Sequence, residues 1–172
     1  MADIDSAPRG AEKKEAFHEA AEANVRPFTF EPPALELLRE VGKVHNKLAG
    51  TDSCRAQIQV LHEGGDNNLH YHPNMDLIYM VLKGRVEFYG LGDKVIGDLG
   101  PYDGILLPEN SRYWFKSSGS EPAWLLQIAG FPKGAKAAKR ISCEPEKRRS
   151  GVTLGVKEGE PETEIIPFGQ EA

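Results

Sequence analysis

Two histidines separated by one residue, His70 and His72, carry the clearest chemical signal in this sequence. They follow the polar stretch "EGGDNN" and precede an apolar segment that ends at Gly84. In an extended strand, residues two apart lie on the same face, so both imidazole rings can reach one metal ion. The same spacing on a helix would not do this, because there the useful spacing is three or four residues. The pair therefore predicts a metal or ligand site carried by a strand.

Residues 50–131 contain the elements that would position this pair. Short apolar segments such as "RAQIQVLHE", "LIYMVLKG" and "AWLLQIAGF" alternate with turn-forming Gly, Pro, Asn and Asp. Within the first segment, Ala56, Ile58 and Val60 alternate with polar residues, which is the pattern of a half-buried strand. Many short strands separated by turns indicate an all-β antiparallel sandwich or barrel.

The two flanking parts differ from this segment in composition. Residues 1–49 are expected to form a helical N-terminal extension, since five apolar residues recur there at helical spacing. These are Leu35, Leu38, Val41, Val44 and Leu48. His18 and His45 would lie in those helices without a functional role. Residues 132–172 are polar and are expected to add one or two short strands, "GVTLGV" and "TEIIPF", packed on the barrel. The basic cluster at residues 133–149 is predicted to be a solvated tail.

The sequence around the histidine pair resembles the first motif of the cupin superfamily, which is roughly G-x5-H-x-H-x3–4-E-x6-G. Gly64, His70, His72 and Gly84 match this motif in spacing. The stretch "GILLPENSRYWF" is similar to the second motif, with Pro108 at the proline position. The resemblance implies a small antiparallel jelly-roll β-barrel with an internal pocket that often holds a divalent metal. It does not imply one reaction, because cupins include oxygenases, isomerases, lyases and plain binding proteins.

Two positions depart from the cupin motifs. Leu77 stands where the first motif has its glutamate, and Asp76 lies one residue earlier. Strand alternation would point Asp76 away from the pocket if Leu77 points inward, unless a bulge redirects it. Tyr113 stands at the histidine position of the second motif. Only two of the four usual ligand positions therefore keep their usual residue.

These departures leave three hypotheses open. In the first, His70 and His72 bind Fe, Mn, Ni or Zn, and Asp76 or Tyr113 completes the site. The barrel would then bind a small organic molecule beside the metal and catalyse oxygenation or isomerase/lyase chemistry, with Asp76 and Tyr113 as catalytic residues. In the second, the metal has been lost and the histidines contact an organic ligand in a non-catalytic binding protein. In the third, the site is inert and the barrel is structural.

Four further residues are candidates for substrate binding. Tyr79 shares the parity of Leu77 and Val81, so it should line the barrel interior. Gln59 and Gln127 lie in apolar strands and need polar partners if they are buried. His62 ends a strand just before the loop and could face the mouth of the barrel.

Composition excludes several other classes of protein. The 172 residues carry a net charge of −5, which argues against nucleic-acid binding. We find no apolar run long enough to span a membrane and no secretory signal, and therefore expect a cytoplasmic protein. The two cysteines do not form a disulfide framework. A homodimer is expected from the resemblance, and residues 25–30 could supply a strand to the partner.

Overall fold

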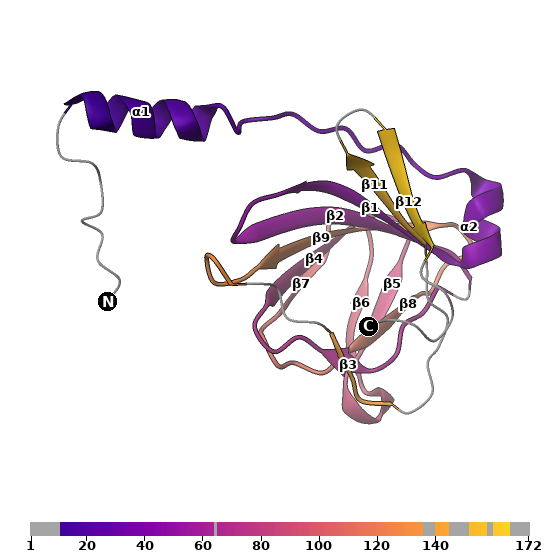
Figure 1. Cartoon of the computed structure of the whole chain (residues 1–172). Coiled ribbons are helices and arrows are strands. Elements are labelled where there is room, and N and C mark those ends of the chain that lie inside the picture. Colours follow the sequence, from indigo (N-terminus) through magenta and orange to yellow (C-terminus); the bar gives the residue numbers. More distant parts are fainter. Residues whose placement is uncertain (1–10, 64, 136–139, 145–151, 158–159, 166–172) are drawn as a thin grey trace.

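The computed structural model describes residues 11–63, 65–135, 140–144, 152–157 and 160–165 (Figure 1). Two helices, α1 (Ala11–Glu22) and α2 (Leu35–Val41), precede the strands in this part of the chain. The strands are β1 (Lys43–Gly50), β2 (Cys54–Leu61), β3 (His70–Tyr71), β4 (Asp76–Lys83), β5 (Val86–Tyr89), β6 (Val95–Leu99), β7 (Gly104–Leu107), β8 (Trp114–Ser117), β9 (Ala123–Gly130), β10 (Ile141–Ser142), β11 (Val152–Lys157) and β12 (Glu160–Ile165). Neither described helix has the length and apolar character needed to cross a membrane.

A seven-stranded sheet, in the order β12-β11-β1-β2-β9-β4-β7, forms one wall of the barrel. A three-stranded sheet, β6-β5-β8, forms the opposite wall, and a short β10-β3 ladder lies beside it (Figure 1). The two walls meet through aromatic rings. Tyr79 on β4 lies 5.4 Å from Phe88 on β5 and 5.6 Å from Phe115 on β8, measured between ring centroids. All three side chains are at most 1% exposed, so they form the centre of the main core.

The predicted helix over residues 33–49 is wrong in its second half. Helix α2 ends at Val41, and Gly42 adopts a left-handed conformation with φ of 74° while its N–H donates to the Leu38 carbonyl. Glycine adopts this conformation without steric cost and so ends the helix. The next eight residues form β1, which pairs with β2. The barrel therefore begins at Lys43, and the predicted boundary at residue 49 is too late.

A second apolar cluster lies on the outer face of the large sheet. Leu38 of α2 packs there with Val44, Ile58 and Val60, which are at most 4% exposed. Phe30 and Trp124 pack against the cluster, with ring centroids 5.0 Å apart. The spacing of Leu38, Val41, Val44 and Leu48 reflects burial on this face, whether a residue is in the helix or in the strand.

Strands from the C-terminal part of the chain add to two of the sheets. β11 lies parallel to β1, with Val44 opposite Val152, and β12 pairs antiparallel with β11. β10 pairs antiparallel with β3, with Ser142 opposite His70. Part of the basic C-terminal segment therefore lies against the strand that carries His70.

Candidate functional site

His70 and His72 converge with Tyr113 inside the barrel. The His70 N–H donates to the Tyr113 carbonyl at 3.1 Å, and the Tyr113 N–H donates back to the His70 carbonyl at 2.9 Å. This bridge holds the His70 ring 4.4 Å from the Tyr113 ring and 5.2 Å from the His72 ring, between centroids. His70 is 2% exposed, whereas His72 is half-buried. The pair therefore spans from the interior toward the surface.

Both histidines are neutral at pH 7. His70 Nδ1 lies 2.7 Å from the Asn68 carbonyl oxygen, which can only accept a hydrogen bond. Nδ1 therefore carries the proton, and Nε2 keeps a lone pair. Burial, followed by the charge of Arg140, holds the pKa of His70 well below its usual value. The same two causes, in the same order, lower the pKa of His72 to about 4.

Tyr79 and Tyr113 form a buried hydroxyl pair beside the histidines. Leu77, Tyr79 and Val81 face the interior of β4, as their shared parity predicts, and each is at most 1% exposed. The hydroxyl oxygens of Tyr79 and Tyr113 lie 3.0 Å apart. Burial raises the pKa of each phenol above its ordinary value. Both groups are therefore protonated at neutral pH, and Tyr113 is a poor metal ligand in that state.

A chain of amides continues this polar region across the large sheet. The Gln127 side-chain carbonyl accepts hydrogen bonds from Gln59 Nε2, at 2.7 Å, and from Gln57 Nε2. Register explains the contacts, since Gln127 on β9 lies between Gln57 on β2 and Tyr79 on β4. The Gln59 amide also opposes part of the rise that burial causes in the pKa of Tyr79. Gln59 and Gln127, two of the candidate binding residues, are thus linked to the tyrosine pair.

His45 joins the same interior region and was missed by sequence reasoning, which placed it in a helix. It lies on β1 opposite Gln59, and its Nδ1 is 3.5 Å from Gln57 Nε2. Burial, followed by the charges of Lys43 and Arg140, lowers its pKa to about 3. Gly42 and the period-two spacing around His45 were the available signals for a strand.

Asp76 does not face the histidine pair, so its predicted roles as metal ligand and catalytic residue are not supported. It is exposed, and its Oδ1 accepts a hydrogen bond from the Glu109 N–H at 2.9 Å. The adjacent Leu77 is 1% exposed and faces inward. No bulge interrupts β4 at this point, because Asp76 and Leu77 pair in regular register with Gly130 and Ala129. Strand alternation therefore directs the carboxylate outward.

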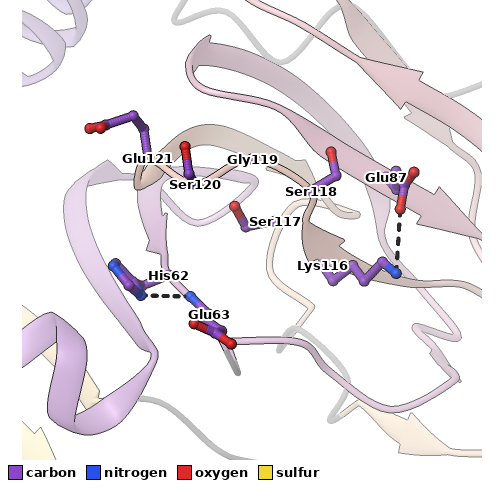
Figure 2. Close-up of a pocket in the computed structure, with 9 residues that line it drawn as sticks. All are labelled: His62, Glu63, Glu87, Lys116, Ser117, Ser118, Gly119, Ser120 and Glu121. Atoms are coloured by element: carbon purple, nitrogen blue, oxygen red, sulfur yellow. Dashed lines mark hydrogen bonds and ion pairs between the residues drawn. The ribbon is translucent and has the colours of Figure 1, made fainter.

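His62 also lies away from the pair. It lines a surface pocket of about 350 Å³ together with Glu63, Glu87, Lys116 and residues 117–121 (Figure 2). His62 Nδ1 accepts a hydrogen bond from the Glu63 N–H at 2.7 Å. The pocket lies at the Ser117 end of β8, whereas Tyr113 immediately precedes the other end. His62 therefore lies at a surface pocket separate from the histidine pair, and its role in substrate binding stays a prediction.

Among the described residues, four buried side-chain polar atoms have no hydrogen-bond partner: Asn46 Oδ1, Ser117 Oγ, Gln59 Oε1 and His72 Nδ1. The last two belong to the region of the histidine and tyrosine pairs. Such atoms are uncommon in folded proteins, because a buried polar atom without a partner costs about 1–3 kcal/mol. One explanation is that a water molecule or a ligand supplies the missing partner. Their position beside the tyrosine pair makes this region the candidate binding site.

The donor set fits a divalent metal poorly. His70 and His72 offer two neutral imidazoles, which suits metal binding. Leu77 and Tyr113, however, occupy the other two motif positions, and one is apolar while the other is a protonated phenol. Within the described ranges, no group of three His, Cys, Asp or Glu side chains could hold an ion. Protein metal sites commonly use three or four protein ligands.

Several solved structures are similar to this chain, among them one with a double-stranded β-helix fold. An RmlC-like cupin family protein from Methanocaldococcus jannaschii has a TM-score of 0.51 and 16% identity, with 62% of this chain and 91% of that chain covered. A conserved protein from Klebsiella pneumoniae with a double-stranded β-helix domain has a TM-score of 0.49 and 20% identity, with 72% and 88% covered. KdgF from Halomonas sp. has a TM-score of 0.46 and 18% identity, with 62% and 88% covered. At these identities the likeness concerns the fold alone.

The sequence itself carries the family assignment. Residues 57–129 match the family model described as a cupin domain. No curated protein sequence matches the chain. Residues 57–129 therefore carry a cupin domain, and the resemblance to the cupin superfamily and the all-β jelly-roll fold predicted from the sequence are both confirmed.

Proposed function

We propose that this cupin binds a small organic molecule inside the barrel without using a metal. The observation that supports the proposal is the pair of buried, unpartnered polar atoms, Gln59 Oε1 and His72 Nδ1. A ligand that donates to these atoms would remove their desolvation cost. Small-molecule sites usually combine apolar walls with a few polar groups, and the interior has this composition.

The surrounding groups would orient such a ligand by hydrogen bonds. His70 and His72 are neutral, so each ring offers one donor and one acceptor. The Tyr79 and Tyr113 hydroxyls lie beside them and are protonated. Since His72 is half-buried and His70 is buried, the ligand would enter from the side of His72. These residues, with Gln59 and Gln127, form the proposed binding set.

A thermal-shift screen of the full chain against small organic molecules tests the proposal. We expect stabilisation by an organic compound, because a ligand that binds only the folded state raises its stability. Gln59→Leu should abolish the shift, since it removes the unpartnered carbonyl. Met80→Leu, on the outer face of the sheet, is the matched control and should keep it.

Metal-dependent catalysis is the competing function, favoured by the two neutral imidazoles. The same screen should include Mn²⁺, Ni²⁺, Fe²⁺ and Zn²⁺. A shift caused by one of these ions and lost in His70→Ala would overturn the metal-free proposal. Stabilisation by organic compounds alone, with no effect of the ions, would support it.

We also propose that two copies associate through an apolar patch on the outer face of β4, β7 and β9. Ile78 lies opposite both Leu106 and Ile128, so the exposed side chains are contiguous. Their exposed fractions are 49%, 61% and 37%. β7 is also an edge strand, which a second copy could cover. Residues 25–30, expected to pair with a partner, form no strand in the single chain.

Light scattering coupled to size-exclusion chromatography tests the dimer. We expect Leu106→Glu to produce a monomer, because it places a charge in the patch. Leu91→Glu, an exposed position outside the patch, should leave the mass unchanged. A wild-type monomer at micromolar concentration would refute the association.

A further inference from the structure

The C-terminal segment brings Arg140 to the histidine pair. β10 pairs with β3, with Ser142 opposite His70 and Ile141 opposite Tyr71. Arg140 and His72 immediately follow the last pair of this ladder, and continuing its register would set them opposite each other. Residues directly opposite in an antiparallel pair share a face, so Arg140 has the same orientation as the two histidines. Its side chain is half-buried, consistent with a position at the barrel mouth.

Further contacts fix this segment on the barrel. The Cys143 N–H donates to the Leu69 carbonyl at 2.8 Å. The Glu144 carboxylate accepts hydrogen bonds from Asn68 Nδ2 at 2.9 Å and from the Leu69 N–H at 3.2 Å. Arg140 is therefore held next to the site by an anchored strand on its C-terminal side.

The charge of Arg140 acts on the whole interior. It lowers the pKa of His45 on β1 and of His70 and His72 at β3. It also opposes the rise in the pKa of Tyr79 and of Tyr113. This influence agrees with the position of Arg140 next to β10, because charge interactions weaken with distance and solvent.

Cations surround the site in the described part of the chain. Every charged side chain that shifts the pKa of His45, His70 or His72 is positive. One of them, Lys43, is only 4% exposed, and its ammonium group lies 5.2 Å from the Phe115 ring centroid. The Glu144 carboxylate accepts hydrogen bonds from Asn68 and the Leu69 N–H. Positive side chains of this kind beside a binding site suit an anion.

We propose that the barrel ligand is a small carboxylate and that Arg140 is its anion-binding residue. This inference rests on the proposed ligand-binding function and specifies its ligand class. A planar guanidinium can donate two parallel hydrogen bonds to a carboxylate. Protonated tyrosine hydroxyls and the neutral histidines then contact the uncharged part of the molecule.

Matched compounds test the ligand class. Full-length protein is titrated with small aliphatic and aromatic carboxylates and with the corresponding primary amides, by calorimetry and thermal shift. At least one carboxylate should bind at millimolar concentration or below, and its amide should bind at least tenfold more weakly. Arg140→Gln should weaken carboxylate binding about tenfold or more, the loss of one charge-assisted hydrogen bond. The carboxylate affinity of Arg140→Lys should lie between those of the wild type and of Arg140→Gln, because lysine keeps the charge and lacks the planar guanidinium.

The controls distinguish the carboxylate inference from the proposed ligand-binding function. Arg112→Gln removes an exposed arginine and should leave carboxylate affinity unchanged. Gln59→Leu should abolish binding of the same carboxylate, which locates it inside the barrel. Equal binding of acids and amides that is lost in Gln59→Leu overturns the carboxylate inference and leaves the ligand-binding function standing. Binding insensitive to Gln59→Leu overturns both, and the absence of any carboxylate-specific binding overturns the inference.

Discussion

The hydroxyl oxygens of Tyr79 and Tyr113 lie 3.0 Å apart at the centre of the barrel, and each side chain is 1% exposed. Tyr79 comes from β4 of the large sheet, and Tyr113 precedes β8 of the small sheet. Their hydrogen bond therefore joins the two walls. Tyr113 also stands at the position where the cupin motif has a metal-ligating histidine. At this position the chain therefore has a structural contact in place of a metal ligand.

Removing one of these hydroxyls leaves the other buried with fewer partners. We expect Tyr113→Phe to lower the free energy of unfolding by about 1–3 kcal/mol. The double variant Tyr79→Phe/Tyr113→Phe should cost less than the sum of the single variants, because the two hydroxyls are coupled. Urea denaturation measures all three. Tyr102→Phe, at an 80% exposed position, is the control, and strictly additive losses would show that the pair is not coupled.

Alanine substitutions at Gly84 and Gly92 distinguish the stability cost of backbone strain from that of steric clash. Both have positive φ, at 77° and 69°. A Cβ on Gly84 would lie 2.8 Å from the Ala123 Cα, whereas one on Gly92 meets nothing within 4 Å. We expect Gly92→Ala to cost about 1–2 kcal/mol from conformation alone. Gly84→Ala should cost at least about 1 kcal/mol more, because the backbone at Ala123 must move. Equal losses would contradict this account.

Stability should depend on pH through the interior histidines. The folded-state pKa values of His72, about 4, and His45, about 3, lie below the unfolded value near 6.5. As pH falls through this range, the unfolded chain binds protons before the folded chain does. The free energy of unfolding is therefore fully retained above about pH 6.5 and declines toward pH 4 and below.

A histidine variant checks the origin of this decline. His45→Gln should reduce the slope of unfolding free energy against pH in that interval, measured by urea denaturation at several pH values. His18→Gln, on the exposed face of α1, should leave the slope unchanged. A His45 variant with the wild-type slope would show that other groups cause the pH dependence.

Asp76 should matter for local stability and not for ligand binding. Its carboxylate accepts the Glu109 N–H on the exposed side of β4. We expect Asp76→Ala to cost about 0.5–1.5 kcal/mol, the contribution of an ordinary hydrogen bond. Affinity for any barrel ligand should stay within twofold of wild type, as measured by calorimetry. A large loss of affinity would restore Asp76 to the site.

Strand parity made part of the site predictable. Tyr79 faces inward as its shared parity with Leu77 and Val81 indicates, and His70 and Gln127 are buried as well. The family motif made Tyr113 a candidate site residue, because Tyr113 stands at the histidine position of the second motif. Their roles in binding stay predictions. Asp76 illustrates the opposite case, since spacing in the motif suggested a ligand whereas alternation correctly indicated an outward side chain.

Other parts of the site could not be read from the sequence. The residues around His45 fit both helical and strand periodicity over a short interval, and only pairing with β2 distinguishes them. Arg140 lies in a basic segment that resembles a solvated tail. The strand that holds it, β10, has two residues, too few to show any periodicity.

The parallel pairing of β1 with β11 has a consequence for folding of the nascent chain. β1 is made early, and its outer edge stays open until residues 152–157 have been synthesised. Such a long-range contact forms slowly, because a large loop must close first. During translation, the exposed edge of β1 is therefore the place where mispairing with other chains would begin and where a chaperone would be most useful.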